Sequence, residues 1–243
     1  MDNRKNTILL TVIAVATLLV AVVGATFAYF TAQGGTGDQA NLNVETETTS
    51  STAMVVNGSI LLHATPDNFD TAETSHLNSE EDAYATVTWR PSTAEGTDPD
   101  FCYTVTLNIT SNDTGYDPGD ADEDVPELLF NIQKSTTDLS GNTAVQTPLE
   151  TGIDGLTYAT VEETNTGATR GAISGWDVTG KTGSWKIEGT ETDGSHKITG
   201  TSAADTVDYW HADMTLVNLD RNQQYNTNKT VVGTLVFANG TCD

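Results

Sequence analysis

The sequence predicts an all-β protein: an antiparallel β-sandwich of the jelly-roll or Greek-key kind, preceded by one N-terminal hydrophobic helix. Three observations lead to this fold class. Short apolar runs that alternate with polar residues recur throughout residues 48–243, clusters of Asn, Asp and Gly separate these runs, and no run with a helical period follows residue 30. Alternation with period two indicates half-buried strands, and Asn, Asp and Gly favour turns. We expect one domain rather than two divided near residue 150.

The first element is an uncharged apolar stretch over residues 7–30, which follows two basic residues. A stretch of this length can remain as a membrane helix, or it can be a signal peptide. Thr26 and Ala28 are small residues at positions −3 and −1 of a cut before Tyr29, and no basic cluster follows that would stop transfer. We favour a signal peptide over residues 1–28, cleaved between Ala28 and Tyr29. If it is retained, the segment is a membrane anchor, and it is the chain's only expected membrane contact.

The N-terminal segment also resembles a known family. Arg4 and Lys5, the long Leu/Val run and the sequence GATFAYFT over residues 24–31 resemble the signal of TasA/camelysin-type proteins. The resemblance implies export from a Gram-positive bacterium, processing by a SipW-type signal peptidase and a jelly-roll sandwich. The camelysin branch is described as metalloproteases, but this chain has no HExxH motif, so no zinc site is carried over.

Residues 29–47 form a Gly-rich exit segment and a first strand, in which Leu42 and Val44 alternate with Asn41 and Asn43. Such a segment can add as a strand to the open sheet edge of a neighbouring copy, with main-chain hydrogen bonds for affinity. The alternative is that it is the first strand of its own sheet.

The clearest strand of the main domain, residues 48–243, is predicted over residues 101–110. Its inward face is expected to carry Phe101, Tyr103, Val105, Leu107 and Ile109, with Cys102 on the outer face. Four further inward sets are Ala85, Val87 and Trp89; Leu128, Phe130 and Ile132; Trp210, Ala212, Met214 and Leu216; and Val231, Gly233, Leu235 and Phe237.

Two dipeptides predict hairpin turns. Asn57-Gly58 and Asp193-Gly194 each lie between two apolar runs, and both pairs favour two-residue hairpin loops, whose central residues need positive φ.

The two cysteines, Cys102 and Cys242, both follow the export segment, so we expect a disulfide between them rather than two separate thiols. Such a bridge would tie the end of the chain to the sheet.

The charge balance is 10 basic against 34 acidic residues, a formal net charge of −24. This argues against binding to nucleic acid, whose phosphates would be repelled, and favours a soluble, solvent-exposed protein.

The densest acidic cluster contains Asp120, Asp122 and Asp124, spaced like the start of a calcium loop. Val125 stands where that loop needs Gly, and Asn131 where it needs a bidentate Glu. A solvated acidic loop is therefore favoured over a Ca²⁺ site, and no other cofactor is expected. The histidines, His63, His76, His196 and His211, have no zinc-protease spacing and are interpreted as surface or strand residues.

No Gly-x-Ser-x-Gly elbow is present, and no catalytic residues are predicted. Three of the four tryptophans (Trp89, Trp185 and Trp210) alternate in step with the inward residues of their strands and are expected in the core. Only Trp176 is free to be exposed. The leading interpretation is a secreted or cell-surface structural protein, a biofilm-matrix or fibre subunit rather than an enzyme. Its expected partners are a signal peptidase, further copies of itself and other surface proteins. The alternatives are an extracellular carbohydrate-binding module and a surface domain held by an uncleaved N-terminal helix.

Overall fold

The computed structural model describes residues 44–45, 50–69, 76–91, 100–116, 125–142, 145, 149, 152–161, 172–200, 204–219 and 221–242. The expected N-terminal helix and signal cleavage site lie outside these residues. Within the described part of the chain, no helix is long and apolar enough to cross a membrane.

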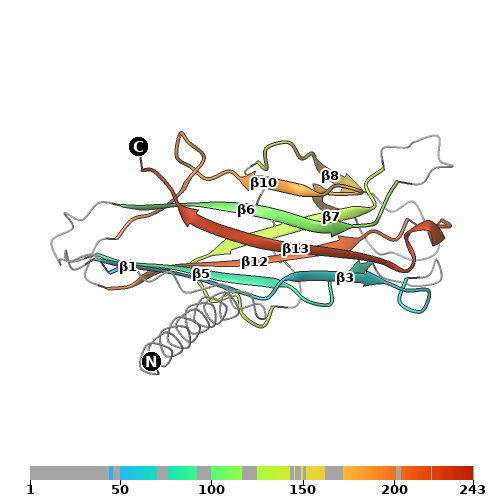
Figure 1. The fold of residues 1–243 in the computed structure, drawn as a ribbon, viewed down its shortest axis with the longest axis horizontal. Coiled ribbons are helices and arrows are strands. Elements are labelled where there is room, and N and C mark those ends of the chain that lie inside the picture. Colours follow the sequence, from blue (N-terminus) through green and yellow to red (C-terminus); the bar gives the residue numbers. More distant parts are fainter. Residues whose placement is uncertain are drawn as a thin grey trace, which may run out of the picture. The chain divides into compact units, whose positions relative to one another are not determined.

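The described chain folds into two antiparallel sheets, whose strands run roughly along the same long direction in Figure 1. The larger sheet has the order β1 (Val44–Glu45), β2 (Ser51–Asn57), β5 (Ala83–Arg90), β12 (Thr206–Leu216), β7 (Leu128–Ser135), β9 (Ile173–Asp177) and β8 (Tyr158–Val161), with β4 (Leu77–Asn78) also paired to β12. The smaller sheet has the order β10 (Gly183–Ile187), β6 (Phe101–Asn112), β13 (Lys229–Asn239) and β3 (Ile60–Ala64), with β11 (His196–Ile198) also paired to β6. One 3₁₀ turn, η1 (Gln224–Asn226), precedes β13. The prediction of an all-β chain with antiparallel sheets is confirmed for the described residues.

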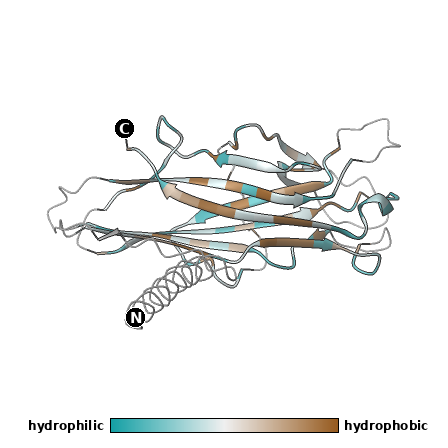
Figure 2. Cartoon of the chain, in the orientation of Figure 1, coloured by the Kyte–Doolittle hydropathy of each residue, from teal (hydrophilic) through white to brown (hydrophobic). Residues whose placement is uncertain are grey.

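The two sheets share one hydrophobic core. Tyr103 of β6 and Trp210 of β12 are both fully buried, and Trp210 Nε1 donates a hydrogen bond to the Tyr103 hydroxyl at 3.1 Å. The inward faces predicted from alternation belong to this core, and Figure 2 shows hydrophobic and polar segments alternating along β6 and β13. Burying one large apolar side chain contributes about 1.5–3 kcal/mol, so the alternating sets account for much of the driving force.

The predicted disulfide is present. Cys102 and Cys242 are bonded, with their Cα atoms 5.3 Å apart and a separation of 140 positions in sequence. The backbone N–H of Gly240 donates to the carbonyl of Cys102 at 2.8 Å, so pairing with β6 continues to the end of the chain. Cys102, predicted on the outer face of its strand, does not belong to the shared core, yet it is only 2% exposed beside the bridge and the neighbouring strand β11.

The hairpin predicted at Asn57-Gly58 is also wrong. The strands on either side of this dipeptide, β2 and β3, belong to different sheets, so the chain crosses from one sheet to the other here. Gly58 does take the positive φ that the dipeptide predicts, at 78°. A Cβ atom on Gly58 would lie 2.7 Å from the carbonyl oxygen of Asp82, so only glycine fits this crossing.

The hairpin predicted at Asp193-Gly194 is also wrong, because the strands on either side of it do not pair with each other. Both β10 and β11 pair with β6, with Ile187 opposite Val105 and His196 opposite Tyr103. Residues 188–195 therefore loop out between two strands that follow the same neighbour.

The outer face of the larger sheet is buried at its centre, which alternation does not predict. On β12, His211, Asp213 and Thr215 point away from the shared core, yet all three are buried. Residues 138–142 and Val145 lie over this face: Leu139 is buried, and the N–H of Val145 donates to Asp213 Oδ2 at 2.7 Å. We call these residues the cover segment. They create a closed polar site on β12.

Candidate functional site

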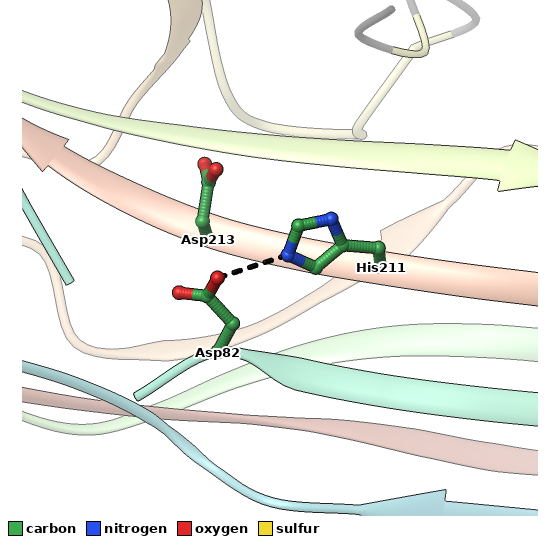
Figure 3. A group of neighbouring side chains, drawn as sticks. All are labelled: Asp82, His211 and Asp213. Atoms are coloured by element: carbon green, nitrogen blue, oxygen red, sulfur yellow. Dashed lines mark hydrogen bonds and ion pairs between the residues drawn. The ribbon is translucent and has the colours of Figure 1, made fainter. Parts of the chain in front are cut away.

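The closed polar site on β12 is built from Asp82, His211 and Asp213 (Figure 3). His211 and Asp213 are two residues apart in a strand, so both side chains project from the same face. Pairing of β12 with β5 places Ala212 opposite Ala83, and Asp82 directly precedes β5. The antiparallel register therefore brings together residues that lie 129 positions apart in sequence.

The three side chains are close enough to act on one ligand. His211 Nε2 lies 3.0 Å from Asp82 Oδ2, and one ligand atom from each of the three residues lies within 4.8 Å of the others. Two contacts orient the carboxylates: Ser79 Oγ donates to Asp82 Oδ1 at 2.6 Å, and the N–H of Val145 donates to Asp213 Oδ2.

Two polar atoms of this site are buried without a hydrogen-bond partner. His211 is fully buried, Asp213 is 3% exposed, and the Asp82 side chain is 11% exposed. Two of their buried atoms, His211 Nδ1 and Asp213 Oδ1, have no hydrogen-bond partner. A buried polar group without a partner costs about 1–3 kcal/mol, so a water or a ligand that bonded to these two atoms would stabilise the site.

The electrostatics of the site are dominated by its carboxylates. Burial and the neighbouring Asp82 raise the pKa of Asp213 to about 6. Hydrogen bonds from the Val145 N–H and from Asn131, together with the attraction of His211, lower this pKa but do not cancel the increase. The ring of Tyr84 stacks on His211, with centroids 4.4 Å apart, and burial followed by the charges of Asp82 and Asp213 raises the pKa of its phenol. No Lys or Arg of the described residues forms an ion pair with Asp82 or Asp213.

A second candidate site is the edge of the larger sheet at β2. Strand β5 pairs with β2 along its whole length, from Ser51 to Asn57. On its other side, β1 pairs only with Ser51 and Thr52. Within the described part of the chain, residues 53–57 have no strand partner on that side.

The structure brings together only some of the residues singled out from sequence. The disulfide pair is joined, whereas the acidic cluster of Asp120, Asp122 and Asp124 and the cleavage site at Ala28 and Tyr29 lie outside the described residues. Of the exit segment, residues 29–47, only Val44 and Glu45 are described.

Trp176, the one tryptophan that the sequence left free to be exposed, is not exposed. It is buried in β9, meets the ring of Tyr158 edge to face at 5.1 Å, and donates from Nε1 to the carbonyl of Leu149. Trp176 was the only tryptophan that the sequence left available for a flat glycan-binding surface.

The sequence interpretation missed the site on β12. The available signal was the pair His211 and Asp213 at positions i and i+2 of a predicted strand, which places an imidazole and a carboxylate on one face. That face was expected to meet water. Asp82 had no such signal, because the pairing of β5 with β12 brings it into place.

Comparison with known proteins adds no assignment: no family model, no curated protein and no solved structure matches the chain.

Proposed function

We propose that this protein is an exported structural subunit of the cell surface or extracellular matrix, and that its copies assemble by strand addition at the β2 edge. Its body in this proposal is a jelly-roll-like β-sandwich, and a signal peptidase releases the exit segment. The observation that carries the proposal is the half-open edge of β2, where β1 pairs with two residues and leaves residues 53–57 without a second neighbour in the described chain.

The chemistry of β2 supports this use of the edge. Natural proteins protect open edges with charged residues or Pro, but β2 reads STAMVVN and has neither. The absence of charge is notable in a chain with a net charge of −24. An uncharged edge of alternating residues can accept an extended segment through main-chain hydrogen bonds.

The register of β1 identifies the segment that fits. Val44 lies opposite Thr52 and Glu45 opposite Ser51. Continued in the same antiparallel register, the exit segment of a second copy would bring Asn41 opposite Val55. Leu42 would then meet Met54, on the core side of the sheet. The sequence of the exit segment thus matches the edge in its alternation.

Two further features support export and the sandwich architecture. The disulfide between Cys102 and Cys242 favours an oxidising compartment. The chain also passes between the two sheets repeatedly, as at β2 to β3, β5 to β6, β6 to β7 and β12 to β13, which is typical of Greek-key and jelly-roll connections.

Mixing two variants of the protein that begins at Tyr29, each with one added cysteine beside the native disulfide, tests the proposal. Asn41→Cys and Val55→Cys, mixed and oxidised, are expected to give a covalent dimer, because residues directly opposite on paired strands have Cβ atoms about 4.5–5.5 Å apart. The matched control mixes Asn41→Cys with Met54→Cys, whose side chain projects from the other face. It is expected to give little dimer.

The double variant Asn41→Cys/Val55→Cys separates the two arrangements. A bridge that forms only within one chain, with no dimer from the mixed single variants, would establish the exit segment as a strand of its own sheet and overturn strand addition. Electron microscopy of the same protein is expected to show filaments.

A further inference from the structure

We propose that Asp82, His211 and Asp213 bind one divalent cation of the zinc class on the outer face of the larger sheet, beneath the cover segment (Figure 3). His211 supplies a ring nitrogen, and each aspartate supplies one carboxylate oxygen. This site is independent of strand addition, because it lies on the central strand β12 and not at the β2 edge.

The three side chains lie near one another, and a modest rearrangement brings them to the spacing of a bound ion. Zn²⁺ holds nitrogen and oxygen ligands at about 2.0–2.2 Å, so two of its ligands can be at most about 4.4 Å apart. His211 Nε2 and Asp82 Oδ2 are 3.0 Å apart, and the whole set lies within 4.8 Å. At a tetrahedral ion the ligands are about 3.4 Å apart, so the most distant of the three ligand atoms must move by roughly 1.4 Å for all three to bind one ion.

An independent observation indicates a ligand at this position. Asp213 is almost completely buried; its Oδ2 accepts the N–H of Val145 and its carboxylate is also stabilised by Asn131, but Oδ1 has no hydrogen-bond partner. A buried carboxylate is stable when it is paired or coordinates a metal. Because no Lys or Arg of the described chain forms an ion pair with Asp82 or Asp213, a divalent cation is the partner that would balance both carboxylates.

The ligand types select the class of cation. Ca²⁺ and Mg²⁺ prefer sites made of oxygen, whereas an imidazole with two carboxylates suits Zn²⁺ and similar transition ions. Three protein ligands leave one tetrahedral position for water. The ion would connect the turn that carries Asp82 with β12 and, through Asp213 and Val145, with the cover segment. Its expected effect is to stabilise this layer over the sheet.

The direct test uses the protein that begins at Tyr29, stripped with a chelator and titrated with Co²⁺ and then Zn²⁺. Co²⁺ is expected to give visible absorption bands that saturate at one equivalent, and Zn²⁺ is expected to abolish them. Zn²⁺ is also expected to raise the melting temperature, because it binds the folded protein. Excess Ca²⁺ should leave the bands unchanged.

Variants separate this site from loose binding to an acidic protein. His211→Gln and Asp213→Asn are each expected to lower the affinity for Zn²⁺ by at least about 10-fold, the loss typical even of residues that only orient a ligand. The matched control is the triple variant Asp120→Asn/Asp122→Asn/Asp124→Asn, which removes more negative charge and is expected to keep the site. His63→Gln controls for loss of a histidine elsewhere.

Each outcome decides the proposal. If the wild-type protein shows no saturable Co²⁺ or Zn²⁺ site, or if the triple variant loses binding while His211→Gln and Asp213→Asn keep it, the proposal is wrong. Circular dichroism checks the fold of each variant. Should His211→Gln or Asp213→Asn not fold, Asp82→Asn, which alters the most exposed of the three ligands, gives the required comparison.

Discussion

At the scale of the single residue, His196 is a histidine that the fold keeps neutral. It is 5% exposed, and its ring stacks on Tyr103 at 5.5 Å and meets Trp210 edge to face at 4.8 Å. Its Nε2 donates to the carbonyl of Ile187 at 3.0 Å. Burial, followed by the positive charge of Lys134, lowers its pKa to about 4. The charged form is therefore disfavoured between the two sheets.

This shift predicts a pH dependence of stability with a definite sign. The unfolded chain binds a proton at His196 below about pH 6.5, whereas the folded protein does so only below about pH 4. The free energy of unfolding is therefore expected to increase from about pH 4 to 6.5, by about 3 kcal/mol, and this contribution is constant above that range. His196→Gln is expected to remove this increase, as measured by urea denaturation at several pH values. Both proteins share the same carboxylates, so the difference between their free energies of unfolding at each pH reports on His196 alone. If the two free energies rise equally with pH, the assignment to His196 is wrong.

At the scale of the element, the crossing between β2 and β3 depends on Gly58. This residue has a φ of 78°, and a Cβ atom would lie 2.7 Å from the backbone oxygen of Asp82. Gly141 offers a matched comparison, because its φ is 89° but no atom lies within 4 Å of where its Cβ would stand.

Substitution by alanine is therefore expected to lower the free energy of unfolding by different amounts at Gly58 and Gly141. Gly141→Ala is expected to lower the free energy of unfolding by about 1–2 kcal/mol, the cost of a left-handed backbone for a residue with a Cβ. Gly58→Ala is expected to cost about 1–3 kcal/mol more, as in overpacked sites, because a backbone oxygen must move. Urea denaturation of the two variants measures the difference, and equal losses would mean that the crossing tolerates a side chain.

The same crossing illustrates what the sequence could predict. Alternation identified β5, β6, β7, β12 and β13 and their inward residues, because each strand carries its own pattern. It could not assign partners: Asn57-Gly58 has the composition of a hairpin turn, yet its strands join different sheets. Positive φ is a local property and was predictable, whereas strand pairing depends on residues far away in sequence.

The site on β12 was hidden for the same reason. Its polar face looked like a face toward water, and only the cover segment and the pairing with β5 make it a closed cluster. His211 and Asp213 could be placed together from their spacing. Asp82 and the burial of all three follow from tertiary structure.

At the scale of the whole molecule, the proposed strand addition has to overcome the negative charge of the chain. Each copy carries a formal charge of −24, so copies repel one another as they approach. The range of this repulsion falls from about 30 Å at about 0.01 M salt to about 3 Å at about 1 M. In the proposed assembly, pairing at the β2 edge would rely on main-chain hydrogen bonds, which are far less sensitive to salt. Assembly followed by light scattering is therefore expected to speed up as NaCl is raised.

A charged substitution at the β2 edge distinguishes the effect of net charge from the effect of strand pairing. Val55→Lys makes the net charge less negative, so a purely electrostatic account predicts faster assembly. Strand addition predicts the reverse at every salt concentration, because a lysine on an open edge opposes pairing. Val236→Lys is the matched control: it adds the same charge on β13, which lies between β6 and β3, at a side chain that is 40% exposed. We expect Val55→Lys to block assembly and Val236→Lys to preserve it. Equal behaviour of the two variants would exclude the β2 edge as the site of assembly.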